Sequence, residues 1–310
     1  MATVSVESYD DLIPAIIVTQ AFDPLAVDVS ENVVDRSMTD GTDTDKKESQ
    51  WNVIREVLTY VGRNYVPPIN SLRGSVISLF HHIPESGHLG SLKTTGLVSR
   101  DLYMPVIDSR VRKYVSGCEV YPRSNTPHIP THGINMLLNT PWQPCEGVTM
   151  DFVTDLPQST ASGYTGILII MDLLTKMAFY LPYQKDINSP GLARLFIEHV
   201  IRKSGVLDNI VTDRGTHLKS RFWIQVYSHL STGHRLPTAF HAQTDRQTKR
   251  QTQMLEQYIW AFYNYQQNNW VELLILAEFT YNNAIHPSTR ITPFLANYDY
   301  HPVVQFKAPK

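Results

Sequence analysis

The chain has 310 residues, of which 42% are hydrophobic, so it is long enough for one domain of good size and a smaller one. Its two cysteines, Cys118 and Cys145, argue against a disulfide scaffold and favour a reducing compartment. No signal-peptide pattern opens the sequence, and no apolar run approaches the ~20 residues of a membrane span. We therefore expect an intracellular protein that does not enter a membrane.

The formal net charge of −2 conceals an uneven distribution. Residues 1–50 hold 11 acidic and 3 basic side chains, whereas the rest of the chain holds 18 acidic and 24 basic ones. The acidic segment is typical of a linker or disordered leader, with at most a transient helix or strand. The mildly basic remainder is compatible with nucleic-acid binding.

Residues 51–75 are predicted to form a β-hairpin extension and the start of a helix. In residues 57–68, β-branched and aromatic side chains flank Gly62-Arg-Asn64, which indicates a hairpin. Residues 72–80 then show helical spacing. A small helical module is expected over residues 76–121, and a proline-rich linker over residues 122–141.

Residues 142–300 are predicted to form an α/β domain, followed by a tail at 301–310. The expected strands are 147–156, 166–172, 177–181, 209–212 and a short fifth at 234–236. The expected helices are 190–203, 221–230 and a long amphipathic one that begins near Asp245. Its apolar stripe comprises Met254, Leu255, Tyr258, Ile259 and Phe262.

Two aspartates stand out in this domain. The apolar run 209–212 brings Asp213 to the carboxyl end of a strand, where open α/β sheets place their chemistry. Asp151 lies in the first strand of the domain. Two neighbouring carboxylates repel each other, and a divalent metal ion is the usual remedy. The alternative is that both are ordinary strand-end residues that cap adjacent turns.

The stretch from about residue 51 to residue 302 resembles the integrases of gypsy-class long-terminal-repeat retrotransposons, which are related to retroviral integrases. The motifs that carry this resemblance are TDRGTHLKSRFW, which contains Asp213, HAQTDRQTK, which ends at Lys249, and TPFLANY, which begins at Thr292. It implies a polynucleotidyl transferase with an RNase H-like core, a five-stranded mixed sheet flanked by helices. A small helical HHCC zinc-finger-like module precedes that core, and the order of the predicted elements agrees.

In that family two Asp residues and a Glu bind two divalent metal ions, Mg²⁺ or Mn²⁺, and 35 residues separate the second Asp from the Glu. Asp151 and Asp213 match the first two ligands, and the fold places their strands side by side. After Asp213 and 35 intervening residues, the position of the family Glu holds Lys249. The resemblance therefore implies that the metal-binding Glu is lost.

The nearest acids on the same helix are poor replacements. Glu256 lies about 10 Å further along the axis than Lys249, and Asp245 lies about 6 Å upstream. A metal–oxygen bond is only ~2 Å long, so we expect neither to act as the ligand. Arg246 stands where the family has Gly, so Arg246, Lys249 and Arg250 are expected to form a cationic patch that binds nucleic-acid phosphate. The alternative is a solvated helix face.

The resemblance also implies a zinc site of two His and two Cys. His81, His88 and Cys118 match three of its ligands, but Tyr121 occupies the fourth position. A neutral phenol is a poor substitute for a thiolate, so Zn²⁺ is expected to bind weakly and the module to be loose or metal-free. The alternative is a helical unit that never binds zinc.

The sequence is therefore interpreted as an integrase-like protein of retrotransposon origin. The family activity is metal-dependent processing of DNA 3′ ends and strand transfer, and we expect it to be lost. DNA is the expected partner, and the family implies a homo-oligomer and a nuclear location. The alternatives are a non-enzymatic module of transposon origin that binds nucleic acid or protein, and a nuclease that uses the same metal ions.

Overall fold

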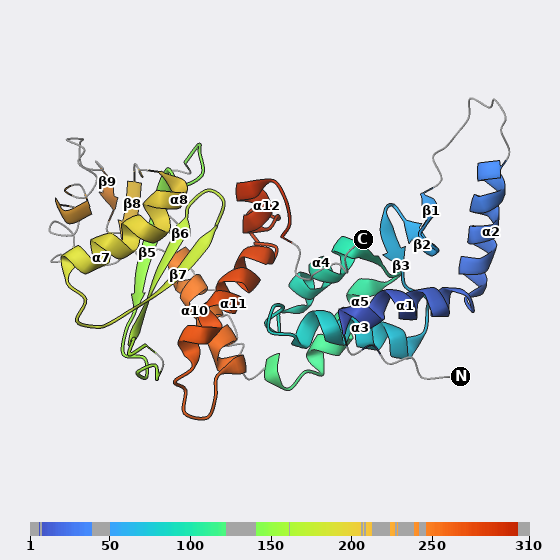
Figure 1. The fold of residues 1–310 in the computed structure, drawn as a ribbon, viewed down its shortest axis with the longest axis horizontal. Coiled ribbons are helices and arrows are strands. Elements are labelled where there is room, and N and C mark those ends of the chain that lie inside the picture. The colour runs from blue at the N-terminus through green and yellow to red at the C-terminus, as the bar shows by residue number, and fades with distance from the viewer. Residues whose placement is uncertain are drawn as a thin grey trace. The chain divides into compact units, whose positions relative to one another are not determined.

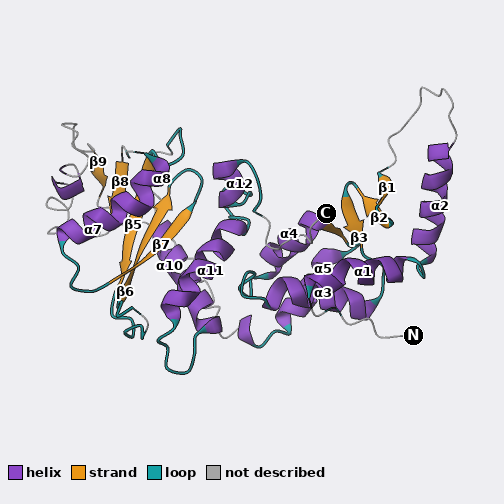
Figure 2. Ribbon diagram, viewed as in Figure 1, coloured by secondary structure: helices purple, strands orange, loops and turns teal. Residues whose placement is uncertain are grey.

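The computed structural model describes residues 6, 8–38, 50–121, 141–160, 162–205, 207, 209–212, 224–226, 228, 239–241 and 246–302. The chain forms two compact units, one of Met1–Arg123 with Val303–Lys310 and the other of Ser124–Pro302. The expected proline-rich linker and most of the expected helix at 221–230 lie outside the described residues. Figures 1 and 2 show the described elements.

The first unit combines helices with a small sheet (Figure 2). Its helices are α1 (Tyr9–Gln20), α2 (Pro24–Met38), α3 (Asn70–His82), α4 (Ser91–Asp101) and α5 (Ile107–Ser116). Its strands are β1 (Trp51–Ile54), β2 (Val57–Tyr60), β3 (Arg63–Tyr65) and β4 (Leu102–Tyr103), in the order β1-β2-β3-β4. The predicted hairpin is the β2–β3 pair. Val61 and Gly62 turn it with φ of 49° and 74°, the left-handed values of a tight hairpin turn.

The structure corrects the interpretation of residues 1–50 as a linker or disordered leader. Residues 9–38 form α1 and α2, and Leu12, Ala15 and Ile16 of α1 are buried in the core that α3 and α4 share. The Gln20 side chain accepts the N–H of Leu58 at 2.8 Å and donates to the Leu58 carbonyl at 3.1 Å. A few apolar residues at helical spacing therefore outweigh the acidic composition.

No single helix among the described residues has the length and apolar character needed to cross a membrane. Helices α1 and α2 meet that test only as a pair, through their Asp10–Gln20 and Pro24–Val33 portions, which are bent by 85°.

The second unit is built on a five-stranded sheet. Its strands are β5 (Gly147–Val153), β6 (Gly166–Asp172), β7 (Ala178–Tyr183), β8 (Asn209–Thr212) and β9 (Ala239–His241). Their order is β7-β6-β5-β8-β9, in which β6 is antiparallel to both neighbours and β5, β8 and β9 are parallel. This is the strand order of the RNase H-like fold, so the predicted fold class is confirmed.

The predicted fifth strand, at residues 234–236, lies outside the described part of the chain. The fifth described strand of this sheet is β9 at 239–241, where Ala239 pairs with Asn209 and His241 with Val211. Only three residues make this edge strand, so its hydrophobic pattern is too short to locate it from sequence.

Helices cover both faces of the sheet (Figure 1). They are α7 (Ser189–Phe196), the π-helix η1 (Ile197–Ile201), α8 (Arg202–Ser204), α10 (Arg246–Phe262), α11 (Trp270–Asn283) and α12 (Pro293–Tyr298). On β6, Leu168 and Ile170 face α7, whereas Ile167 and Ile169 face α10 and α11. Side chains that alternate along β6 are thus buried on both faces, which explains its unbroken apolar sequence.

Helix α11 also satisfies backbone groups of the edge strand β7. The Asn282 amide accepts the N–H of Ala178 and donates to its carbonyl, both at 2.9 Å, and it is fully buried. A carboxylate oxygen of Glu278 accepts the N–H of Tyr180 at 2.8 Å. These side chains take the place of a neighbouring strand, so part of the β7 edge is covered.

We predict that Asn282→Leu lowers the free energy of unfolding by about 2 to 4 kcal/mol, because two buried backbone groups lose their partners. Urea denaturation measures the change. The control is Gln253→Leu on the exposed side of α10, which we expect to change stability by no more than about 0.5 kcal/mol. Equal stability of the two variants would contradict the role given to Asn282.

Candidate metal centre and the carboxylate of Asp151

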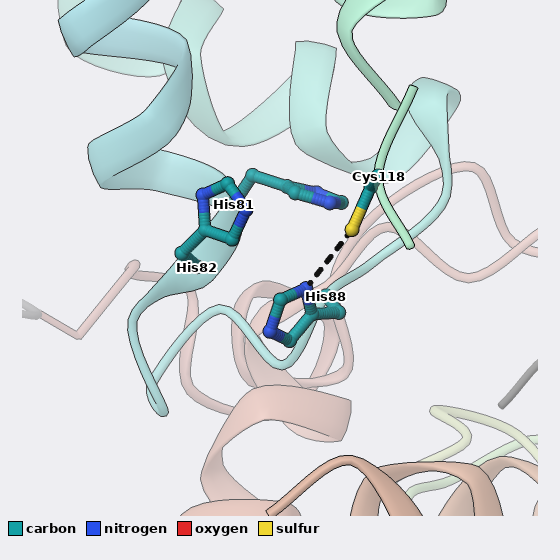
Figure 3. Close-up of side chains that lie close together, drawn as sticks. All are labelled: His81, His82, His88 and Cys118. Atoms are coloured by element: carbon teal, nitrogen blue, oxygen red, sulfur yellow. Dashed lines mark hydrogen bonds between the residues drawn. The ribbon is translucent and has the colours of Figure 1, made fainter. Parts of the chain in front are cut away.

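Four metal-binding side chains gather at the end of α3. The donor atoms of His81, His82, His88 and Cys118 all lie within 4.8 Å of one another (Figure 3). His81 and His82 are the last residues of α3, and Cys118 follows α5. Gly87 and His88 have left-handed φ of 62° and 48°, and this turn lets the His88 N–H donate to the His81 carbonyl at 3.1 Å. The fold therefore brings together the three predicted ligands and adds His82.

The imidazoles pack at similar distances. The ring centroids of His81, His82 and His88 are 5.0 to 5.1 Å apart in every pair. Nδ1 of His88 lies 3.5 Å from Sγ of Cys118 (Figure 3). Two ligands of one tetrahedral Zn²⁺ are separated by ~3.6 Å when the Zn–N and Zn–S bonds have their usual lengths. His81, His88 and Cys118 are buried, and His82 is exposed.

Hydrogen bonds around His81 determine which ring nitrogen carries the proton. The Thr94 hydroxyl donates to the Leu89 carbonyl at 3.0 Å, so its oxygen is left to accept from Nδ1 of His81, 3.5 Å away. Nε2 of His81 is then an unprotonated acceptor. It is buried and has no hydrogen-bond partner among the described residues. A buried lone pair without a partner is costly, and a metal ion would satisfy it.

Burial favours the neutral, metal-binding form of two of these imidazoles, those of His81 and His88. Burial first, then the neighbouring His88 and His82, lowers the pKa of His81 to about 4. Burial and His82 also lower the pKa of His88. Three imidazole nitrogens and one sulfur are a donor set that tetrahedral Zn²⁺ accepts, so these residues fit the ion.

Tyr121 lies where it packs against helices. Its hydroxyl would be 2.9 Å from a Cβ atom placed on Gly90, and its ring packs against the buried cluster of Ile77, Val111 and Val115. The sequence prediction considered only position 121 for the fourth donor and missed His82. The signal for His82 was the pair of consecutive histidines at a helix end.

Asp151, which lies within β5, contacts α10. Oδ2 of Asp151 accepts the Thr252 hydroxyl at 3.1 Å, and Oδ1 accepts the N–H of Phe152 at 2.9 Å. Strand β8 runs parallel to β5, and Thr212 pairs with Met150, the residue before Asp151. The predicted adjacency of these two strands is confirmed. Asp213 itself lies outside the described residues.

Helix α10 carries the other predicted site residues. Arg246, Lys249 and Arg250 are among the first five residues of this helix. The structure describes only the backbone of these five residues, and their side chains are outside the described part. Lys249 precedes Thr252 by three residues and Glu256 follows it by four, so all three lie on one face. Burial first, then the charge of Asp151, raises the pKa of Glu256. Asp245 lies outside the described residues.

Comparison with known proteins finds similarity to integrases and retrotransposon polyproteins. Residues 68–127 match the family described as the integrase zinc binding domain. The chain is also 28% identical over 239 residues to the Transposon Tf2-3 and Tf2-4 polyproteins of Schizosaccharomyces pombe. These matches make the chain similar to retroviral-type integrases. The matched region covers 77% of this chain and 18% of each polyprotein, so the chain spans about a fifth of the length of these relatives.

Two solved integrase structures are also similar. The simian T-cell lymphotropic virus intasome with the PP2A regulatory subunit B56 gamma is 15% identical, with a TM-score of 0.47, over 76% of this chain and 78% of that one. The HTLV-2 integrase catalytic core domain with magnesium, in its trimeric form, is 16% identical, with a TM-score of 0.38, over 51% and 99%. Both TM-scores are below 0.5, so the fold assignment of this chain depends on its strand order alone.

We predict that Gly90→Ala destabilises this protein by about 1 to 3 kcal/mol, because the new methyl group meets the Tyr121 hydroxyl. In a Tyr121→Phe background the nearest remaining ring atoms are at 3.5 and 3.6 Å, an ordinary contact, so the loss shrinks. Thermal unfolding at a fixed zinc concentration measures the coupling between the two changes, expected to exceed about 0.5 kcal/mol. If Gly90→Ala costs the same in both backgrounds, Tyr121 does not pack there.

Proposed function

We propose that this chain is an integrase-like DNA-binding protein of retrotransposon type that has lost 3′-end processing and strand transfer. The observation that carries the proposal is the lysine at position 249. The Thr252 hydroxyl bonds to Asp151. Lys249 is three residues before Thr252, so the Cα atoms of these two residues are about 4.5 Å apart along the axis of α10. A residue at this place on α10 is positioned to meet ions bound by Asp151.

A lysine there opposes a metal pair in two ways. It supplies no oxygen ligand, and its ammonium group repels the ions. At an effective dielectric constant of ~20, unit charges ~4 Å apart interact by about 4 kcal/mol, and a divalent ion roughly doubles this. Catalysis of phosphodiester chemistry by two metal ions needs both of them fixed on either side of the reacting phosphate. The residues at this site do not fit a pair of Mg²⁺ or Mn²⁺ ions, so we derive no catalytic step.

The same substitutions favour binding of DNA phosphate. Arg246, Lys249 and Arg250 stand in the first turns of α10, a helix of 17 residues. The amino end of a helix presents unpaired N–H groups and a partial positive charge, which together attract phosphate. Three cations there add attraction that salt screens. DNA is therefore the proposed partner, with assembly into a homo-oligomer and a nuclear location as the further expectations of the family.

The zinc module has a structural part in this proposal. His81, His88 and Cys118 would hold a Zn²⁺ ion that ties the end of α3 to the segment after α5. In small modules the free energy of metal binding is a large part of the free energy of folding. The ion would stabilise the module and take no part in strand chemistry.

A second candidate function is that of an enzyme that retains some DNA nicking or strand transfer, because another carboxylate replaces the one missing at position 249. Glu256 lies on the same face of α10 as Thr252, and its pKa responds to the charge of Asp151. A chain in which Glu256 acts as the third carboxylate would retain nicking or strand transfer. We favour the inactive form, because Glu256 lies about 6 Å along the axis from Thr252, on the side away from position 249.

A strand-transfer and nicking assay with Mg²⁺ or Mn²⁺ tests the proposal. We predict that the parent chain stays at background and that Lys249→Glu raises the rate by at least about 100-fold, because the ligand set regains its third carboxylate. Adding Asp151→Asn to Lys249→Glu should abolish the gain. Activity in the parent that is lost in Glu256→Gln would instead support the second function, and parent activity that survives Glu256→Gln would contradict both accounts.

The same proteins report on DNA binding. Affinity for duplex DNA measured at several salt concentrations should fall steeply for the parent, and Lys249→Ala should reduce the log–log slope by about 0.9. Arg202→Ala, an exposed cation on α8, is the matched control and should leave the slope unchanged. A slope near zero for the parent would reject DNA binding by this chain.

A further inference from the structure

We propose that His82 is the fourth zinc ligand of this chain and takes the place of the second thiolate that the integrase pattern puts at position 121. The site is then composed of three His and one Cys. Because it concerns only metal binding in the first unit, its test is independent of any activity of the second unit.

The contacts of His82 leave one ring nitrogen for a metal ion. Nδ1 lies 3.3 Å from the Ser78 carbonyl, 3.2 Å from the Ser78 hydroxyl and 3.4 Å from the Tyr114 hydroxyl. A histidine that binds metal through one nitrogen usually donates the other N–H to a carbonyl or a similar acceptor, and this orients the ring. The Ser78 carbonyl is such an acceptor, so Nε2 is left as the second donor of the ring.

His81 provides an independent reason to expect an ion at this cluster. Its Nε2 is buried and has no hydrogen-bond partner within the described residues, and the Thr94 contact leaves that nitrogen without a proton. His81, His82, His88 and Cys118 form a group of donors within 4.8 Å. Binding would draw these atoms together by about 1 Å, to the ~3.6 Å separations of a tetrahedral site. His82 is exposed at the end of α3, where a small movement is least hindered.

In this arrangement His82 is the fourth ligand, and Tyr121 has a packing role. The Tyr121 side chain packs beside Gly90 and the apolar cluster of α3 and α5, so it contributes buried contact area and no ligand atom. One thiolate and three neutral imidazoles leave a bound Zn²⁺ with a net charge of +1, whereas two thiolates would neutralise it. We therefore expect a site weaker than one with two cysteines but still tetrahedral.

Zinc competition against a chromophoric chelator tests the proposal on the full chain. We expect the parent to bind one Zn²⁺ and His82→Ala to bind at least about 100-fold more weakly, because a tetrahedral site loses one of its four ligands. Tyr121→Phe and His199→Ala should stay within about twofold of the parent, since neither residue belongs to the cluster. His199 is the matched control, a histidine on the π-helix η1.

Cobalt substitution gives a readout that does not depend on loss of binding. Co²⁺ in the parent should show tetrahedral ligand-field bands with the charge-transfer band of a single thiolate. His82→Cys should bind Co²⁺ with that charge-transfer band about doubled, because a second thiolate enters the coordination sphere. The proposal is overturned if the parent binds no zinc, if His82→Ala retains parental affinity, or if the band of His82→Cys equals that of the parent.

Discussion

The second unit depends on how α10 is held against strand β5. The hydrogen bond from the Thr252 hydroxyl to Asp151 joins a side chain of the helix to the strand, and the burial of Leu255 and Tyr258 against β6 and β7 fixes the same helix face. The parallel pairing of β5 with β8 brings the chain that leads to Asp213 beside Asp151. This geometry fixes the place of residue 249 along α10 whatever its side chain is. Under the proposed function, a cation then stands where the third carboxylate of a metal site would be.

The two candidate metal sites differ in what surrounds the altered position. At the end of α3 the family pattern would put a thiolate at position 121, and in our proposal the imidazole of His82, next to His81 in the sequence, supplies that donor instead. On α10 the altered residue carries a positive charge, and the nearest described acid on that face, Glu256, lies about two turns further along. A site that loses a ligand can be repaired by a neighbour within bonding distance, whereas repulsion between a cation and metal ions opposes binding even when a ligand is near.

Sequence reasoning located the elements whose patterns are long and regular. The bounds of β6 and β8 and the apolar stripe of α10 follow from hydrophobic periodicity between turn residues, and the structure has them as predicted. The sequence did not predict the elements whose formation or position depends on tertiary contacts. The buried face of α1 holds few residues within an acidic segment, and β9 has only three residues. His82 was missed because matching a family pattern assigns each ligand to one position, and only the fold shows that a neighbouring residue reaches the same point.

The central claim is that the core of this integrase-like chain cannot hold a pair of divalent ions. Counting bound Mn²⁺ by electron paramagnetic resonance tests it directly, with the histidine cluster filled by Zn²⁺ beforehand so that it does not contribute. The account predicts no more than a single weakly bound Mn²⁺ per chain, at Asp151 and Asp213. Two tightly bound Mn²⁺ ions per chain, with the magnetic coupling of close neighbours, would contradict it.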